Sequence, residues 1–594
     1  MRLCGQLILS IFLLSIALIS PAHAVTSDRE LFSNGLDHLR SNDPKQALVL
    51  FDQVIKEYPL NDFVSFYSGE AFLSLNDPVT AVSYFKKVPD DSVIYLDSQY
   101  KLTKCKILSD EKLSSKEQYG RSLYLYESGS FRDASLEFRK LVRNFPDSEE
   151  VANSYVYAGL SEYKRGSYPN AISYFKKGIS AGSEIADLAY YRMGFSYGRS
   201  GELQAAINSF EKVIKYFPSS EYADDAQNFI AYYLEINGQQ AAAMKNYGRL
   251  AYKYPNSDWA DDVYWDLGQV YYKSGSYKAA LNAFEKVAKM LPDTDKADEC
   301  LFWQAKSLEK LGSKAKAKSI YEKLVQRYDH SYYSYRARKK LGLSLEFEPA
   351  YADENVVSLP RMDEMLALKF YDKAYNELSN YTDKASDDEI KGALKIYIPI
   401  FYEAGIYYDP LALAEYEINK FLKRGEKVSD DLVKLMYPEG YRDFVEKYAA
   451  IYNLDKYLVY AVIREESRFK PKANSSAQAY GLMQIIPSTG YGIAKHINIA
   501  NFHPGKMYDP ETNIRMGCFY LDNLSGRLGS RVLAIAGYNG GPGSAQRWWR
   551  NFGGKEFDDF VLSITYSETR WYVQKVLGSY YEYRRLYEGN LPPI

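Results

Sequence analysis

The first half of the chain repeats one spacing of small, aromatic and helix-ending residues. Glycines recur every 35 to 37 residues, an alanine follows each glycine after five residues, and an aromatic residue follows each alanine after four. The glycines are Gly129, Gly166, Gly201, Gly238, Gly275 and Gly312, the alanines are Ala134, Ala171, Ala206, Ala243, Ala280 and Ala317, and the aromatic residues are Phe138, Phe175, Phe210, Tyr247, Phe284 and Tyr321. Prolines stand twelve residues after four of these alanines, at Pro146, Pro218, Pro255 and Pro292. The pattern predicts one helical hairpin per repeat.

Each repeated residue type suits one part of such a hairpin. Glycine adopts positive φ at little cost in the tight turn between two helices, alanine lets the helices approach, the aromatic ring fills the gap, and proline ends the second helix. Weaker copies lie around Ala47 and Ala81, which predicts about eight hairpins between residues 31 and 341. The pattern resembles the tetratricopeptide repeat and predicts an α-solenoid. Many of the 58 tyrosines would pack its core, whereas those on a concave face could instead bind a partner.

The periodicity stops between residues 341 and 360, where two prolines and mixed residues predict a linker. Residues 361–436 return to helical patterning without the repeat spacing. We interpret them as a helical connector that docks the array against the segment that follows. They contain no pattern that indicates chemistry.

The N-terminus has the layout of a secretory signal peptide. Arg2 precedes a mostly apolar run over residues 7–19, and small residues stand at positions −3 and −1 before Val25. The run is shorter than the roughly 20 apolar residues of a membrane-spanning helix. We therefore predict cleavage after Ala24 and export.

Composition narrows the class of partner. The 74 Lys and Arg residues nearly balance the 76 Asp and Glu residues, which argues against a nucleic-acid partner. From residue 437 onward 19 basic residues exceed 15 acidic ones, a mild excess that suits an anionic polymer such as a cell wall. After cleavage three cysteines remain, and their odd number argues against a disulfide framework. We expect buried thiols at Cys105, Cys300 and Cys518.

One carboxyl group lies on the apolar side of a helix predicted over residues 455–469. Val459, Val462, Ile463 and Glu466 share a face at the i, i+3, i+4, i+7 spacing. Desolvation there would favour the protonated carboxyl, as a general acid requires. Glu465 points about 100° away around the helix. The alternative is that Glu466 pairs with a neighbouring arginine, at position 464 or 468.

Four motifs from Glu466 onward occur in one order, with a fifth segment between the second and the third. They are Glu466-Ser467, Gly481-Leu482-Met483-Gln484, Asp509-Pro510-Glu511-Thr512-Asn513-Ile514, Gly537-Tyr538-Asn539-Gly540-Gly541-Pro542-Gly543 and Ser567-Glu568-Thr569-Arg570-Trp571-Tyr572. Together they resemble the catalytic domain of soluble lytic transglycosylases, glycoside hydrolase family 23, over residues 437–586. One departure is Gly537, where the family usually has alanine.

The resemblance implies a mostly α fold: a tetratricopeptide-like α-solenoid, a helical connector and a C-terminal lysozyme-like α domain. We expect a signal peptide over residues 1–24, the repeat array over 25–342, the linker and connector over 343–436 and the catalytic domain over 437–594. The resemblance also implies a periplasmic protein that binds peptidoglycan strands, with protein partners on the repeats as a further option. No nucleic acid, metal or cofactor is expected.

The resemblance assigns a role to each motif residue. Glu466 is the catalytic acid, and Ser467 helps to orient it. Tyr538 reaches the reaction centre, Asn539 supports its turn, and Glu568 contacts the sugar from the opposite wall. The groove beside the reacting sugar is lined by Gly481, Met483 and Gln484.

The implied reaction cleaves the β-1,4 bond between N-acetylmuramic acid and N-acetylglucosamine. Protonated Glu466 would donate to the bridging oxygen, and the ionised form would then accept the proton of the muramic acid 6-hydroxyl as that hydroxyl attacks its own anomeric carbon. The product is a 1,6-anhydro end. Two alternatives stay open: a hydrolase of goose-type lysozyme character that uses water, and a non-catalytic peptidoglycan-binding scaffold.

Overall fold

The computed structural model describes residues 22–109, 111–254, 257, 259–290, 296–328, 330–343, 357–475 and 477–590. Residues 1–21 of the predicted signal peptide and most of the predicted linker lie outside these ranges. In the described ranges the chain is almost wholly helical, and β-structure in these ranges is limited to two isolated bridges at Tyr480. Of the described helices, none has the length and apolar character that crossing a bilayer requires. The mostly α class is confirmed.

The chain forms two compact units. The first comprises residues up to 263 together with residues 358–378, and the second comprises residues 264–357 and 379–594. Helix α15 (Ala260–Lys273) and helix α21 (Tyr371–Thr382) each run from one unit into the other.

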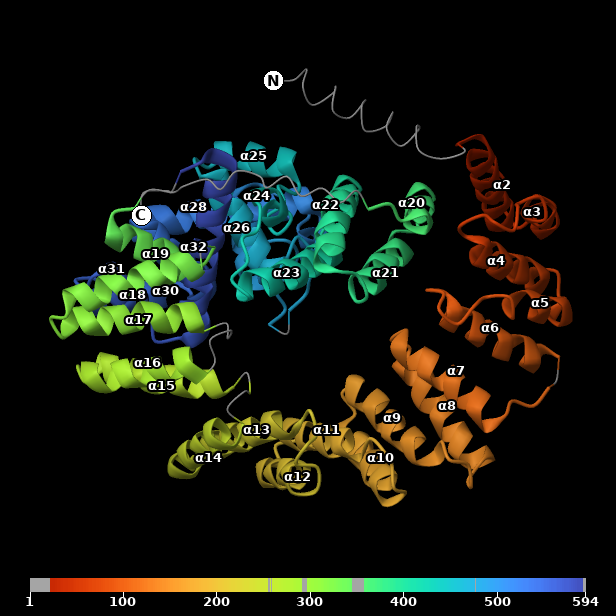
Figure 1. Ribbon diagram of the computed structural model, residues 1–594, viewed down its shortest axis with the longest axis horizontal. Helices are drawn as coiled ribbons and strands as arrows, with labels where there is room; N and C mark the ends of the chain where they lie inside the picture. Colours follow the sequence, from red (N-terminus) through yellow and green to blue (C-terminus); the bar gives the residue numbers. More distant parts are fainter. Residues whose placement is uncertain are drawn as a thin grey trace. The chain divides into compact units, whose positions relative to one another are not determined.

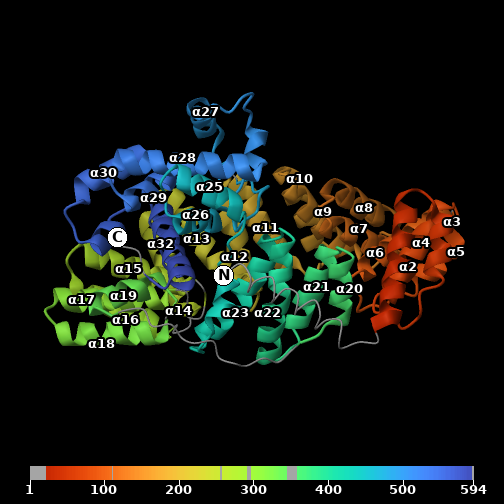
Figure 2. The same ribbon diagram turned by 90° about the horizontal axis from the view of Figure 1, so that it is seen from above.

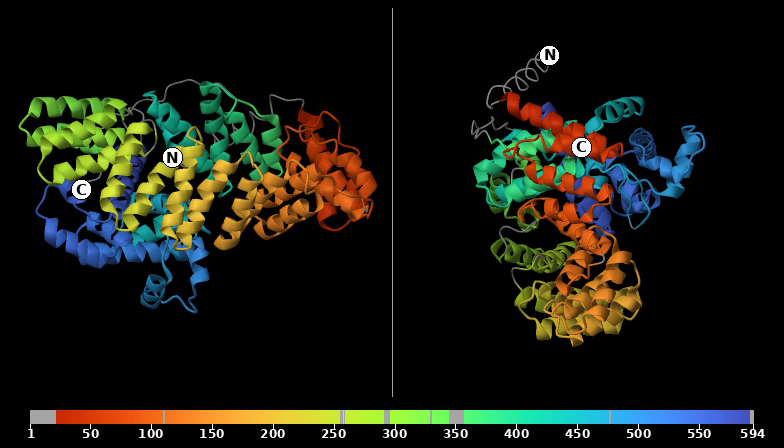
Figure 3. Two further views of the ribbon diagram at one scale, coloured as in Figure 1. Left: turned by 90° about the horizontal axis from the view of Figure 1, so that it is seen from below. Right: turned by 90° about the vertical axis from the view of Figure 1, so that its right-hand side faces the viewer.

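The first unit holds paired repeat helices that follow one another along the chain (Figures 1 and 3). Its helices are α2 (Ala22–Arg40), α3 (Pro44–Phe51), α4 (Asn61–Ser74), α5 (Pro78–Phe85), α6 (Tyr95–Leu108), α7 (Ser115–Glu127), α8 (Phe131–Asn144), α9 (Val151–Lys164), α10 (Tyr168–Ser180), α11 (Ala186–Arg199), α12 (Leu203–Tyr216), α13 (Ala223–Ile236), α14 (Gln240–Lys253) and α20 (Pro360–Ala367).

The second unit holds the last repeats, the rest of the connector and the C-terminal helices. They are α16 (Tyr277–Met290), α17 (Ala297–Lys310), α18 (Lys314–Arg327), α19 (Tyr332–Leu341), α22 (Asp387–Glu403), α23 (Tyr408–Lys423), α24 (Asp430–Lys434), α25 (Arg442–Ile451), α26 (Lys456–Ser467), α27 (Pro487–His496), the 3-10 turn η1 (Pro504–Tyr508), α28 (Pro510–Leu528), α29 (Arg531–Gly540), α30 (Pro542–Phe552), α31 (Phe557–Leu562) and α32 (Ser567–Glu588). Helix α27 projects beyond α28 (Figure 2).

The repeat spacing has the structural meaning that the sequence predicts. All six turn glycines have φ between 76° and 81°, and the six alanines are at most 2 % exposed. Five of the six aromatic residues are also buried, and Tyr247 is partly exposed. Pro146 and Pro218 follow the ends of α8 and α12, while Pro255 and Pro292 lie outside the described residues.

In five of the hairpins a second glycine lies at the contact between the two helices, and the spacing described above does not include it. A Cβ atom at any of these positions would lie 2.3–2.7 Å from the phenylalanine ring 16 residues later. The pairs are Gly35 with Phe51, Gly69 with Phe85, Gly159 with Phe175, Gly194 with Phe210, and Gly268 with Phe284. The absence of a side chain therefore lets the ring of the second helix pack onto the backbone of the first.

In the first unit, part of the connector packs against the first repeats. Glu364 on α20 accepts from Arg29 at 2.8 Å, and its carboxylate also accepts from Tyr58 at 3.0 Å. The ring of Phe370 lies 6.5 Å from that of Phe32 and 5.6 Å from that of Phe63. Residues some 300 positions apart in sequence therefore share one core.

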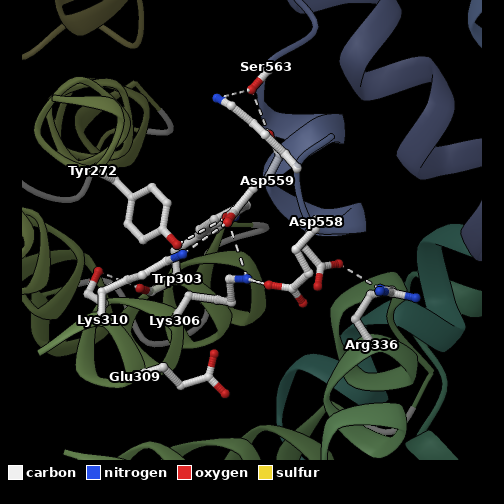
Figure 4. A network of polar contacts seen from close by, with 12 residues as sticks. Tyr272, Trp303, Lys306, Glu309, Lys310, Arg336, Asp558, Asp559 and Ser563 are labelled. Carbon is white, nitrogen blue, oxygen red and sulfur yellow. Dashed lines mark hydrogen bonds and ion pairs between the residues drawn. The ribbon is translucent and has the colours of Figure 1, made fainter. Parts of the chain in front are cut away.

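In the second unit, ion pairs hold helix α31 against the last repeats (Figure 4). Lys306 on α17 is fully buried, pairs with Glu556, and lies 3.5 Å from the carboxylate of Asp559. Arg336 on α19 binds Asp558 at 2.6 Å, and both side chains are at least 94 % buried. Helix α32 begins five residues after α31 ends, so this contact fixes the approach to α32.

Candidate active site

Glu466 lies in the last turn of α26, close to where the sequence predicts it. The carboxylate of Asp455 caps the helix start by accepting from the Tyr457 amide at 2.9 Å. Residues 457–463 are all buried. The helix ends because Arg468 and Phe469 both adopt left-handed φ, 46° and 60°, which turns the chain sharply after Glu466.

The environment of Glu466 keeps its carboxyl protonated. Burial is the main reason that its pKa rises from 4.5 to about 8. The hydroxyl of Tyr572 opposes this rise in pKa, and the negative charges of Glu465 and Glu568 add to it. At neutral pH the group is therefore a proton donor, as a general acid must be.

The neighbouring arginines are engaged elsewhere. Arg464 binds Glu415 and also Glu465, the latter at 2.5 Å. Arg468 binds the other carboxylate oxygen of Glu415 at 2.9 Å. The alternative in which an adjacent arginine neutralises Glu466 therefore has no support in the described contacts.

Two tyrosines face Glu466: Tyr572, which is buried, and Tyr538, which is partly exposed. The Tyr538 hydroxyl donates to the carbonyl oxygen of Met483 at 2.8 Å. The Tyr572 hydroxyl is buried and has no hydrogen bond of standard geometry among the described residues. Burial, reinforced by the charge of Glu466, raises the pKa of both phenols far above 10. Both therefore stay neutral and able to donate a hydrogen bond.

The segment from Gly481 to Gln484 is held against α26. The Ser467 hydroxyl lies within hydrogen-bond distance of two carbonyl oxygens, that of Leu482 at 2.7 Å and that of Ile463 on α26 at 3.1 Å. Gly481 has φ of 78°, and a Cβ atom there would lie 2.1 Å from the Met507 carbonyl oxygen. A side chain at position 481 would therefore displace backbone.

The remaining predicted residues lie where α29 meets α32. Asn539 accepts from the Thr569 hydroxyl at 2.6 Å, and Glu568 is exposed in the first turn of α32. Trp548 is buried and donates to Thr565, whereas Trp549 is 50 % exposed. The structure thus brings the predicted site residues together from α26, the segment 481–484, α29 and the start of α32.

Sequence reasoning missed Tyr572 and Asn513 as site residues. Tyr572 closes the last quoted motif, and its i+4 spacing from Glu568 on a helix could have placed both on one face. Asn513 belongs to the fifth segment, which begins helix α28: Asp509 caps this helix by accepting from the Thr512 amide at 2.9 Å. Its further role depends on distant backbone, which no local spacing reveals.

Asn513 is fully buried and holds three backbone groups around the segment 481–484. It accepts from the Met483 amide at 2.7 Å and donates to the carbonyls of Tyr480 at 2.9 Å and Met507 at 2.7 Å.

Substitution Asn513→Ala leaves these groups unpaired. We expect a loss of about 2–3 kcal/mol in the free energy of unfolding, measured in urea. The control Asn523→Ala, exposed on the same helix, should change it by less than about 0.5 kcal/mol. Equal values for the two would contradict this role.

The three cysteines Cys105, Cys300 and Cys518 are all buried as thiols, which confirms that prediction.

Comparison with known families assigns two parts of the chain. Residues 443–561 match the family described as Transglycosylase SLT domain. Tetratricopeptide repeat families match residues 32–92, 230–257, 261–294 and 299–331, and the family described as Outer membrane lipoprotein matches residues 111–236.

Curated relatives match the C-terminal part. The soluble lytic murein transglycosylase of Escherichia coli (strain K12) is 36% identical over 167 residues, which cover 28% of this chain and 26% of that protein. The Salmonella typhimurium protein of the same description is 37% identical over 163 residues, 27% of this chain and 25% of that protein. The match spans about a quarter of these relatives.

A solved structure matches nearly the whole chain. The 70 kDa soluble lytic transglycosylase of Escherichia coli has a TM-score of 0.56 at 20% identity, covering 94% of this chain and 97% of that chain. This likeness shows the fold, an α-solenoid followed by a lysozyme-like α domain. The C-terminal part of the chain is therefore similar to the soluble lytic transglycosylases, and the chain joins N-terminal tetratricopeptide repeats to a segment that matches the Transglycosylase SLT domain.

Proposed function

We propose that the protein is a peptidoglycan lytic transglycosylase, a carbon-oxygen lyase, in which Glu466 is the sole acid and base. The observation that carries this proposal is the state of Glu466: a carboxyl with a pKa of about 8, beside two neutral tyrosines and within a Transglycosylase SLT domain. Such a group can donate a proton at neutral pH and accept one in the next step.

Each step uses a group of the described site. Glu466 gives its proton to the oxygen that bridges muramic acid and glucosamine, and that bond breaks with positive charge developing at the anomeric carbon. The muramic acid 6-hydroxyl then attacks this carbon and passes its proton to Glu466. The nucleophile is part of the substrate, so its proximity replaces a bound water.

The neighbours of Glu466 suit these two steps. The buried Tyr572 hydroxyl can donate to Glu466 once the carboxyl is ionised, which stabilises the intermediate charge state. The Glu568 carboxylate, exposed in the first turn of α32, can stabilise the developing positive charge on the sugar. Most glycosidases need a second carboxyl as base or nucleophile, whereas here the returning proton goes back to Glu466.

The products test the proposal. We expect purified peptidoglycan incubated with the full-length protein to yield muropeptides that end in 1,6-anhydro-muramic acid, identified by mass spectrometry. Products heavier by the mass of one water would overturn transglycosylation in favour of the hydrolase alternative. Tight binding of peptidoglycan with no cleavage would instead support the scaffold alternative.

We also propose the setting of this activity. The substrate is the glycan strand of peptidoglycan, the protein acts in the periplasm after removal of residues 1–24, and the catalytic domain covers residues 437–594. The repeat array, residues 25–342, offers a surface for protein partners.

A further inference from the structure

The arginine two residues before Glu466 joins three parts of the chain. The guanidinium of Arg464 binds Glu415 on α23, binds Glu465 at 2.5 Å, and donates to the Met436 carbonyl at 2.9 Å. Glu465 in turn accepts from the Ser579 hydroxyl on α32 at 2.5 Å. The side chains of Glu415, Arg464 and Glu465 are each 12% exposed.

This cluster meets both helices that form the site around Glu466. Glu465 is the residue next to Glu466 on α26, and Ser579 lies on the helix that carries Tyr572 and Glu568. Arg464 and Ser579 both donate to the same oxygen of the Glu465 carboxylate, Oε1, which ties this oxygen to a residue of α26 and to a residue of α32. The negative charge of Glu465 therefore stays at a fixed place beside the site.

We propose that Glu415, Arg464 and Glu465 form a positioning cluster that holds Glu466 beside Tyr572 and favours its protonated form. None of the three would touch the substrate; they act through Glu466. The inference deepens the proposed function and rests on it. It also gives the connector a role in the chemistry, since Glu415 lies outside residues 443–561, the segment that matches the Transglycosylase SLT domain.

The other charged and titratable groups around these carboxyls come from several helices. Glu568 and Tyr572 on α32 and Tyr538 on α29 face Glu466. Around the cluster lie Arg468 after α26, Tyr402 on α22, Tyr437 between α24 and α25, and Tyr583 on α32. Burial raises the pKa of every one of these tyrosines, so they stay neutral in the range where Glu466 titrates.

The charge of Glu465 predicts the direction in which the pKa of Glu466 changes on substitution. In Glu465→Gln the amide oxygen can still accept from Arg464 and Ser579, but the negative charge is gone. Ionised Glu466 is then less disfavoured, so its pKa falls. Because the acid must be protonated in the free enzyme, the alkaline limb of kcat/KM moves to lower pH.

The experiment compares the pH dependence of kcat/KM on peptidoglycan for the wild type, Glu465→Gln, Glu465→Asp and Glu415→Gln. We expect the limb of Glu465→Gln to move down by roughly half a pH unit. Glu465→Asp keeps the charge, so its limb should stay near the wild-type pH while kcat falls as the bonds lengthen. Glu415→Gln leaves the charge of Arg464 less compensated, which should also move the limb down.

Glu446→Gln is the matched control. It removes one negative charge from α25, where Glu446 pairs with Lys456 at 2.8 Å, and its limb should match the wild type. If the alkaline limb of kcat/KM in Glu465→Gln lies at the wild-type pH, the inference is wrong. If the limb in Glu415→Gln lies at the wild-type pH, the connector residue Glu415 does not belong to the positioning cluster. Neither of these two results contradicts the proposed function as long as the wild type cleaves peptidoglycan. A wild type that cleaves no peptidoglycan would contradict the proposed function itself. Thermal unfolding identifies any variant that does not fold, and Glu465→Gln, which conserves shape, then carries the test.

Discussion

Substitution Glu466→Gln is expected to lower peptidoglycan turnover by about 10³-fold or more while making the folded protein more stable at neutral pH. The amide can neither donate the acidic proton nor accept one in the second step. It also removes a carboxyl that the fold holds in an unfavourable environment, because burial raises the pKa of Glu466 from 4.5 to about 8.

The stability change has a defined pH dependence. Below pH 4.5 the Glu466 carboxyl is protonated in both the folded and the unfolded chain, so it does not lower the free energy of unfolding. As the pH rises toward 8, the unfolded chain ionises and the folded one does not, so the wild type loses stability that Glu466→Gln keeps. We expect the variant to gain about 1–3 kcal/mol at pH 7.5 relative to its difference at pH 4.5.

Urea unfolding of the wild type and Glu466→Gln at the two pH values measures this gain. Glu446→Gln is the control, and its expected sign is opposite, because Lys456 lowers the pKa of Glu446. A difference between Glu466→Gln and the wild type that does not change with pH would contradict the raised pKa. Retained turnover would show that another residue is the acid.

Substitution Asp558→Ala is expected to lower the free energy of unfolding of the second unit by about 3–5 kcal/mol. Asp558 and Arg336 are 4 % and 5 % exposed, and the carboxylate accepts from the guanidinium at 2.6 Å. The substitution leaves a buried guanidinium without its partner. The guanidinium carbon of Arg336 also lies 4.2 Å from the ring centroid of Phe557, so it cannot reach water without disturbing α31.

Thermal unfolding measures the loss, with Asp431→Ala as the control. Asp431 pairs with Lys434 at 3.2 Å, but both side chains are largely exposed, and such a pair contributes about 0–1 kcal/mol. The double substitution Asp558→Ala with Arg336→Met should recover part of the loss, because no unpaired charge remains buried. Equal destabilisation by the two aspartate variants would contradict the account of α31.

Local spacing was enough to predict the repeats and the position of Glu466. Turn glycines, buried alanines and packed rings recur because the two helices of each hairpin pack in the same way. Residues at positions i, i+3 and i+4 lie on one face of a helix, which was enough to place Glu466. The partners of Arg464 were not predictable. Glu415 lies 49 residues away on a connector helix, and a single ion pair produces no repeated spacing in the sequence. Asn513 and Tyr572 were missed for a similar reason, since their roles depend on groups that only the fold brings near.

The contact between the connector and the first repeats has a consequence for biosynthesis. A solenoid needs its terminal repeats covered, and here Phe32 and Phe63, at 0 % and 1 % exposed, are packed in part by Phe370. At about 5–20 residues per second, roughly 300 further residues take on the order of 15–60 s to emerge. Until then the first hairpin has an uncovered apolar end. An uncovered apolar end of this kind favours aggregation, and truncation before residue 370 would make the exposure permanent.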